Sequence, residues 1–168
     1  PKIDAEMGII DNGPGEINNS TDPFNDFDGF VGIEVRGQSS QYFYPKKSYS
    51  FETRDEEGEN LDVPILGMPE ENDWIFYAPY GDKSMLRNMI SFWIARQMDV
   101  YATRTVFCEV MLNGEYMGVY VMMEKIKKDE NWSVMKIILK KHNKNLGSIL
   151  LIIMLFSALS CRNEQVSN

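Results

Sequence analysis

The chain has few of the residue types that bind zinc or carry nucleophilic catalysis. It contains two cysteines, Cys108 and Cys161, and a single histidine, His142. The cysteines lie far apart in dissimilar contexts, so no Cys/His metal-binding spacing is present. A Ser-His-Asp or Cys-His mechanism would have to use His142, which lies in a lysine-rich segment that we expect to be non-globular. We therefore set these mechanisms aside and assign no metal ligand.

Positive charge is also scarce. The 168 residues include 17 Lys and Arg against 25 Asp and Glu, which gives a formal net charge of −8 and a sequence pI near 4.7. Duplex binding needs a clustered basic surface, so nucleic acid is excluded as the main partner. The composition, 43% hydrophobic and 25% charged, is typical of a folded chain. This length suits one domain with a real core, or one lobe of something larger.

Alternating apolar residues predict an antiparallel sheet. Val31, Ile33 and Val35 alternate with small or charged residues, which is the period of a half-buried strand. Asn113-Gly114 lies between two such runs and is the strongest hairpin signal in the chain. Residues 1–29 are rich in turn residues and are expected to form a lead-in loop. We expect strands at residues 31–35, 48–52, 73–78, 105–112 and 115–123.

One helix is expected, over residues 82–98. Asp82 is a candidate N-cap, and the apolar residues that follow have the three- and four-residue spacing of a helix face. The methionines on this face are interpreted as core filling, and Cys108 as a small buried hydrophobe. This face comprises Met85, Leu86, Met89, Ile90, Trp93 and Ile94.

A polar stretch between the first two strands carries the candidate binding site. Residues 36–51 leave one strand through a turn of small and polar residues and enter the next strand beside Lys46 and Lys47. This arrangement can present backbone N–H groups and positive charge to a phosphate. The alternative is an ordinary surface hairpin whose lysines are solvated. The candidate residues are Arg36, Gln38, Ser39, Ser40, Lys46 and Lys47.

The tail, residues 131–168, differs from the rest in pattern. A basic segment beginning at Met135 is followed by an unbroken apolar run at 149–159 and then by Cys161. Residues 135–161 therefore resemble a bacterial secretory or lipoprotein signal peptide, which predicts a secreted or cell-surface lipoprotein. Because such a signal belongs at an N-terminus, we infer a frameshift, a gene fusion or an assembly fault. The alternative is a C-terminal hydrophobic anchor, with membrane contact through 149–159.

Several spaced motifs between Pro1 and Lys128, about three quarters of the chain, together resemble the CotH kinase family, the spore-coat-protein-H-like atypical kinases. Their order along the chain makes the resemblance more specific than any single motif would. The motifs are Ile33–Gln41, Phe43–Tyr49, Asp73-Trp74, Asp82-Lys83 with Leu86–Asn88, and Leu112–Tyr116 with Gly118 and Glu124–Ile126.

The resemblance implies an α+β fold over residues 1–130. The expected architecture is a kinase-like N-lobe, a twisted antiparallel sheet with one packed helix, followed by a separate hydrophobic helix-like segment in the tail. The stretch that begins at Arg36 would stand where protein kinases keep their glycine-rich loop. Lys46 or Lys47 would meet the phosphates of ATP, with Mg or another divalent metal, and Glu124 would lie near the adenine-side hinge. The full-length family acts on protein substrates.

Two departures from the family pattern limit what the chain is expected to do. The expected helix has no Glu on its apolar side to pair with a lysine, and no stretch resembles the catalytic and metal-binding aspartates of the C-lobe. We therefore assign no catalytic residue and predict a truncated lobe that is inactive by itself. The alternatives are a secreted or surface-anchored binding or coat-assembly module that uses no nucleotide, and a chain with no independent function.

Overall fold

The computed structural model describes residues 1–126. The chain divides into two units, Pro1–Ile126 and Lys127–Asn168. The predicted tail at 131–168, including the signal-like segment at 135–161, lies outside the described residues. Within the described part, no helix is long and apolar enough to cross a membrane.

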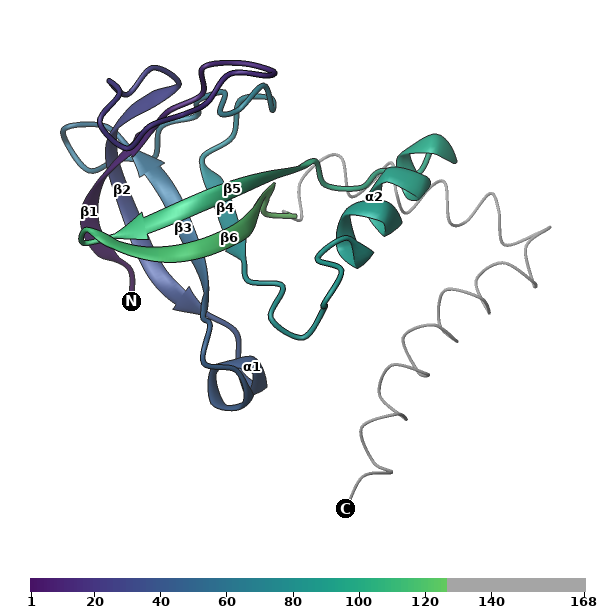
Figure 1. Ribbon diagram of the computed structural model, residues 1–168. Helices are drawn as coiled ribbons and strands as arrows, with labels where there is room; N and C mark the ends of the chain where they lie inside the picture. Colours follow the sequence, from purple (N-terminus) through teal and green to yellow (C-terminus); the bar gives the residue numbers. More distant parts are fainter. Residues whose placement is uncertain (127–168) are drawn as a thin grey trace. The chain divides into compact units, whose positions relative to one another are not determined.

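The first unit is built on one six-stranded antiparallel sheet, which confirms the predicted α+β class. Figure 1 shows that the sheet is strongly curled, so that the β5–β6 hairpin crosses the direction of the first strands. The spatial order is β1-β2-β3-β4-β6-β5. The strands are β1 (Ile3–Ile9), β2 (Phe27–Arg36), β3 (Ser48–Arg54), β4 (Asp73–Tyr77), β5 (Thr105–Leu112) and β6 (Glu115–Glu124).

The prediction of a lead-in loop over residues 1–29 is wrong for its first part. Strand β1 lies within it and pairs with β2 from Ile3 opposite Ile33 to Ile9 opposite Phe27. Alternate β1 side chains, including Ala5 and Ile9, pack against the core. The strand was missed because the turn-rich residues after Ile9 made the whole segment resemble a loop.

The core lies on the inner face of the curled sheet. Phe51, Trp74 and Tyr120 come from β3, β4 and β6, and each is completely buried. The connection between β3 and β4 folds over this face and contributes Ile65 and Met68, which are also buried. This connection makes only isolated β-bridges.

The β5–β6 hairpin forms as predicted. Asn113 and Gly114 have φ values of 51° and 80°, which are the left-handed conformations that a two-residue hairpin turn requires. The pairing of β5 with β6 shifts register between Val110 and Met111. Gly118 of β6, which lies opposite Val110, has φ 81°. The hairpin therefore contains a bulge close to its turn.

Helix α2 (Arg87–Gln97) begins later than predicted. Asp82 is not its N-cap, because the chain first makes a turn in which the Asp82 carboxylate accepts hydrogen bonds from Ser84 Oγ at 2.7 Å and from the Arg87 backbone N–H at 2.9 Å. The Asp82 carboxylate, which lies before the helix, thus accepts a hydrogen bond from the backbone N–H of the first helical residue, a group that has no partner within the helix. These hydrogen bonds outweigh the effect of burial, which would raise the pKa of Asp82, and lower that pKa.

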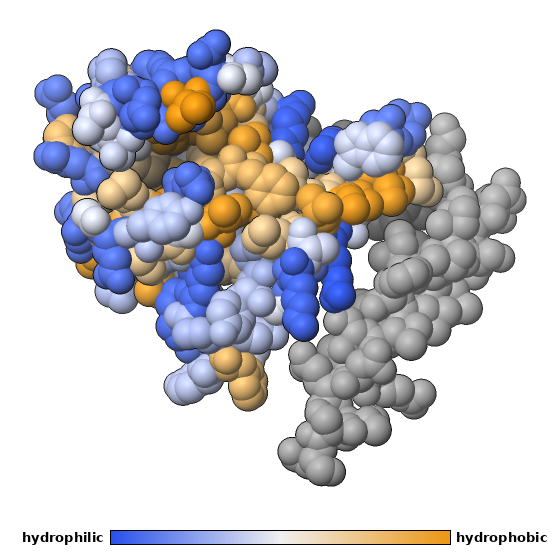
Figure 2. All heavy atoms as spheres, viewed as in Figure 1, coloured by the Kyte–Doolittle hydropathy of each residue, from blue (hydrophilic) through white to orange (hydrophobic). Residues whose placement is uncertain are grey.

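The expectation of one packed helix is only partly right. A second, short helix, α1 (Ser39–Phe43), lies in the β2–β3 connection. No residue of α2 is buried, and only Met89 and Phe92 pack against the sheet, beside Ile75, Val121 and Met123. The prediction that the helix face fills a core is therefore wrong for most of its residues. Figure 2 shows apolar side chains gathered at the surface in the region of α2.

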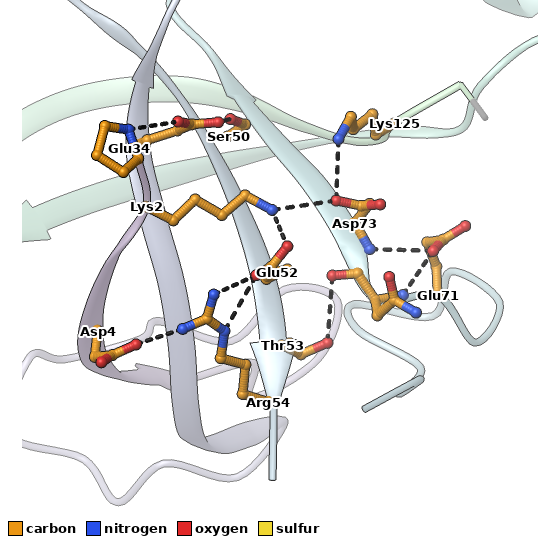
Figure 3. A network of polar contacts seen from close by, with 12 residues as sticks. Lys2, Asp4, Glu34, Ser50, Glu52, Thr53, Arg54, Glu71, Asp73 and Lys125 are labelled. Atoms are coloured by element: carbon orange, nitrogen blue, oxygen red, sulfur yellow. Dashed lines mark hydrogen bonds and ion pairs between the residues drawn. The ribbon is translucent and has the colours of Figure 1, made fainter. Parts of the chain in front are cut away.

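The outer face of the sheet carries a network of ion pairs over its first strands (Figure 3). Lys2 binds Glu52 of β3 and lies 3.5 Å from Asp73 of β4. Lys125 binds the same Asp73 at 3.1 Å, and Arg54 binds Glu52. The side chains of Lys2, Glu52 and Asp73 are each less than 20% exposed. The network therefore ties the start of the chain to the middle of the sheet.

Candidate functional site

The candidate site is the connection between β2 and β3, residues 36–48. Its first and last residues, Arg36 and Ser48, lie opposite each other in the pair of β2 and β3. In Figure 1 the connection, with α1 in it, projects beyond the ends of these two strands. The Tyr44 ring lies 5.5 Å from that of Tyr80, between ring centroids, which fixes the connection to the segment after β4.

The polar residues at the start of this connection face solvent. Arg36, Gln38 and Ser39 are exposed, and Ser40 is half-buried in α1. Gly37 has φ 109°, a conformation that favours glycine and turns the chain from β2 into α1. The structure therefore keeps these predicted site residues together on one projecting connection.

Lys47 is fixed to the backbone of its own connection. Its ammonium donates hydrogen bonds to the carbonyl oxygens of Gln41 at 2.5 Å and Tyr44 at 2.8 Å. These carbonyls belong to the last turn of α1 and the residue after it, where helix carbonyls lack partners within the helix. Lys47 therefore closes the C-terminal end of α1.

Lys46 points in a different direction, to the inner edge of the sheet. Its ammonium donates to the carbonyl oxygen of Val119 in β6 at 2.6 Å and lies 4.2 Å from the centroid of the Tyr120 ring. Partial burial lowers the pKa of Lys46 below its ordinary value of 10.5. A cation over an aromatic face is attracted by the ring's quadrupole. The two adjacent lysines therefore have separate surroundings.

The residues that receive Lys46 were not among the predicted site residues. They are Gly118, Val119 and Tyr120, which we call the β6 seat. A Cβ added at Gly118 would lie 3.2 Å from Lys46 Nζ, so the glycine leaves room for the ammonium. A glycine inside a strand pattern indicates a bulge or the close approach of another group to the backbone. Gly118 was therefore the sequence signal that could have indicated the contact with Lys46.

Glu124 lies apart from the contact between Lys46 and Val119. It lies at the other end of β6, about 16 Å from Val119 at roughly 3.3 Å per residue. Its carboxylate accepts hydrogen bonds from the Arg104 backbone N–H at 2.9 Å and from Arg104 Nη1 at 3.4 Å. Glu124 thus joins the start of β5 to the end of β6, and its place near the adenine-side hinge stays a prediction.

The surroundings of the β6 seat are apolar. Burial raises the pKa of Cys108 to about 12 and that of Tyr120 to about 12. Tyr120 Oη is buried and has no hydrogen-bond partner among the described residues. Cys108 is therefore held as a neutral thiol, and it packs against the core as a half-buried side chain, which agrees in part with its interpretation as a buried hydrophobe.

No group of three or more His, Cys, Asp or Glu side chains able to hold a metal ion occurs among residues 1–126. The described residues therefore offer no ligand set that fits a metal ion. We derive no step that uses a metal.

One comparison with known proteins decides the family. The model of the family described as CotH kinase protein matches residues 33–148, which is more than half of the chain. The chain belongs to the CotH kinase family. The match begins in β2, includes the 36–48 connection and the β6 seat, and ends beyond the boundary that we predicted at residue 130. A search of curated proteins found no match.

Proposed function

We propose that residues 1–126 act as the nucleotide-binding lobe of a CotH-type kinase. The observation that carries this proposal is the position of Lys46. Its ammonium stands where the 36–48 connection meets the inner edge of the sheet, and it is held there by β6. A lysine held in place beside a polar connection suits a phosphate, for which lysine acts as a point charge.

The order of the elements supports the same proposal. A connection between two adjacent antiparallel strands is followed by a third strand, a helix and a final hairpin. Protein kinases cover the phosphates of ATP with a loop between strands and use a lysine together with a helix that follows. In this chain the lysine would come from the connection before β3. Strand β4 contains no lysine that could take this role.

We further propose that the 168 residues by themselves transfer no phosphate. Phosphoryl transfer depends on positioning and on metal ions that bridge the phosphate oxygens. The sequence offers no stretch that resembles the catalytic and metal-binding aspartates of the family's C-lobe. The expected activity is therefore binding of ATP without turnover, and a protein substrate would be modified only by a complete kinase.

Calorimetric titration of the 168-residue chain with ATP, with and without Mg²⁺, tests the binding. We expect saturable binding, and no phosphate release or autophosphorylation in a parallel assay with labelled ATP. Transfer at a rate comparable with that of a full-length family member would contradict the proposed inactivity. Absence of any ATP binding would contradict the nucleotide-binding role and favour a surface-anchored binding module.

A further inference from the structure

A kinase lysine needs a partner that holds its ammonium toward the phosphates. In protein kinases this partner is a glutamate of the helix that follows the lysine's strand. Helix α2 contains neither Asp nor Glu, so it offers no carboxylate for this purpose. The described residues nevertheless hold Lys46 against β6, and they do so without an acid.

We propose that Lys46 is the phosphate-binding cation, that the β6 seat replaces the missing carboxylate in holding it, and that Lys47 is a positioning residue. This rests on the proposed nucleotide-binding function and adds the way in which Lys46 is held and the separate role of Lys47. The Val119 carbonyl, 2.6 Å from Lys46 Nζ, and the Tyr120 ring, 4.2 Å away, share the role of the acid.

The chemistry of the seat leaves Lys46 able to bind a phosphate. A lysine ammonium has three N–H donors, and within residues 1–126 its one hydrogen bond goes to Val119. A carbonyl and an aromatic ring orient the cation without neutralising its charge, whereas a carboxylate would offset that charge. The held side chain also loses less conformational freedom when a ligand binds, which favours affinity.

Lys47 has the opposite character. Two of its donors are used by Gln41 and Tyr44, and both contacts are within the connection that it would otherwise present to a ligand. Binding a phosphate would require the loss of these hydrogen bonds and would open the end of α1. Its contribution is therefore to hold α1 and the residues before it in shape.

The first test compares ATP affinities of the full chain carrying Lys46→Met, Lys47→Met or Lys83→Met. Lys83 is exposed and lies outside the connection, so its substitution controls for general loss of charge. Loss of a charge-assisted hydrogen bond should weaken ATP binding about tenfold to a hundredfold in Lys46→Met. Lys47→Met should weaken it by about threefold or less, and Lys83→Met should have no effect. Inorganic triphosphate should give the same ranking.

A pair of glycine substitutions tests the seat itself. Gly118 and Gly114 have nearly equal φ values, 81° and 80°, so alanine meets a left-handed φ at both positions. An added Cβ at Gly118 reaches Lys46 Nζ, whereas at Gly114 it meets nothing within 4 Å. Both variants should lose similar stability, but only Gly118→Ala should weaken ATP binding. Equal ATP affinity in the two variants would overturn the role of the seat.

A measurement without nucleotide tests the position of Lys46 separately from its role in ATP binding. In an NMR spectrum of the free chain, the Hε signals of Lys46 should be shifted upfield by the Tyr120 ring, and the shift should persist in Tyr120→Phe. If ATP binds but Lys47→Met loses more affinity than Lys46→Met, the assignment of the cation is wrong while the nucleotide-binding role stands. If neither ATP nor triphosphate binds, the nucleotide-binding role fails and the assignment fails with it. An unshifted Lys46 signal would contradict the seat alone.

Discussion

The curled sheet and helix α2 bury their apolar residues to very different extents. Trp74 in β4 is completely buried, whereas Trp93 in α2 is 56% exposed. The sheet closes its core with its own strands and with the β3–β4 connection. Helix α2 contacts the sheet mainly through Met89 and Phe92. The sheet therefore closes its main core without α2, which packs only on the smaller cluster of Ile75, Val121 and Met123.

The same difference in burial sets the candidate site apart from helix α2. An open groove of about 370 Å³ lies along α2 and the start of β5, lined by Leu86, Ile90 and Trp93 among others. The Lys46 ammonium is instead received by β6, next to the buried core. The candidate cation is thus held by the stable part of the molecule, so its position should not depend on how α2 packs.

The largest expected effect comes from comparing the two tryptophans. Trp74→Ala leaves a cavity in the core and should lower the free energy of unfolding by about 3–5 kcal/mol. Trp93→Ala removes a half-exposed side chain and should cost about 1 kcal/mol or less. Urea unfolding followed by circular dichroism measures both. Equal losses would show that α2 is as much a part of the core as the sheet is.

A smaller effect is expected from the ionic outer face of the sheet. Burial alone would raise the pKa of Glu52, but hydrogen bonds from Lys2 and Arg54 more than offset it, so the pKa is lowered. The carboxylate therefore stabilises the fold above its ordinary pKa of 4.5, and this contribution is lost as pH falls through the lower folded value. Glu52→Gln should cost about 1–2 kcal/mol at pH 7.

The exposed Glu56 provides the matched control, because it lies on a turn at the surface. Glu56→Gln should leave the unfolding curve unchanged at every pH. In Glu52→Gln the stability difference from the parent chain should shrink as the pH falls below 4.5. A difference that stays constant down to pH 2 would rule out the ionised carboxylate as its source.

Reactivity of Cys108 tests how well the inner face excludes water. Burial raises its pKa to about 12, so almost no thiolate is present at pH 8. In a Cys161→Ser background, iodoacetamide at pH 8 should modify the folded chain much more slowly than the chain in urea. Mass spectrometry measures the two rates. Similar rates would mean that the inner face opens readily.

The smallest effect is expected at the hydroxyl of Tyr120. Because Oη is buried without a partner among the described residues, Tyr120→Phe removes an unsatisfied polar atom and keeps the ring. The free energy of unfolding should stay the same or rise by up to about 1 kcal/mol. A clear loss of stability in the same urea experiment would show that the hydroxyl has a partner in solution.

Sequence reasoning was most successful for the strands and for the β5–β6 hairpin. Val31 and Ile33 alternate with other residue types, and Asn113-Gly114 is a local turn signal, so both depend on neighbours in the sequence. Strand β1 was missed because turn-rich residues follow it and because its partners in β2 lie far along the chain, from Ile9 opposite Phe27 to Ile3 opposite Ile33. The exposure of α2 was missed because periodicity shows that a helix has an apolar face but not whether another element covers it.

The candidate site was located from the sequence but its two lysines were not distinguished. Lys46 and Lys47 are adjacent in a polar segment, and no local pattern shows which one turns toward β6. That depends on a contact between residues far apart in the chain, Lys46 and Val119. Glu124 was placed with the site by resemblance, and its hydrogen bonds to Arg104 became visible only in the folded chain.

The most direct test of the central claim is to add ATP to the wild-type chain while following the lysine side-chain NMR signals. We expect the Lys46 signals to move progressively to saturation, because the Lys46 ammonium meets the phosphates beside the β6 seat. The Lys47 signals should move far less, because its ammonium stays bound to Gln41 and Tyr44. Saturable movement of Lys47 with unchanged Lys46 signals would contradict the account.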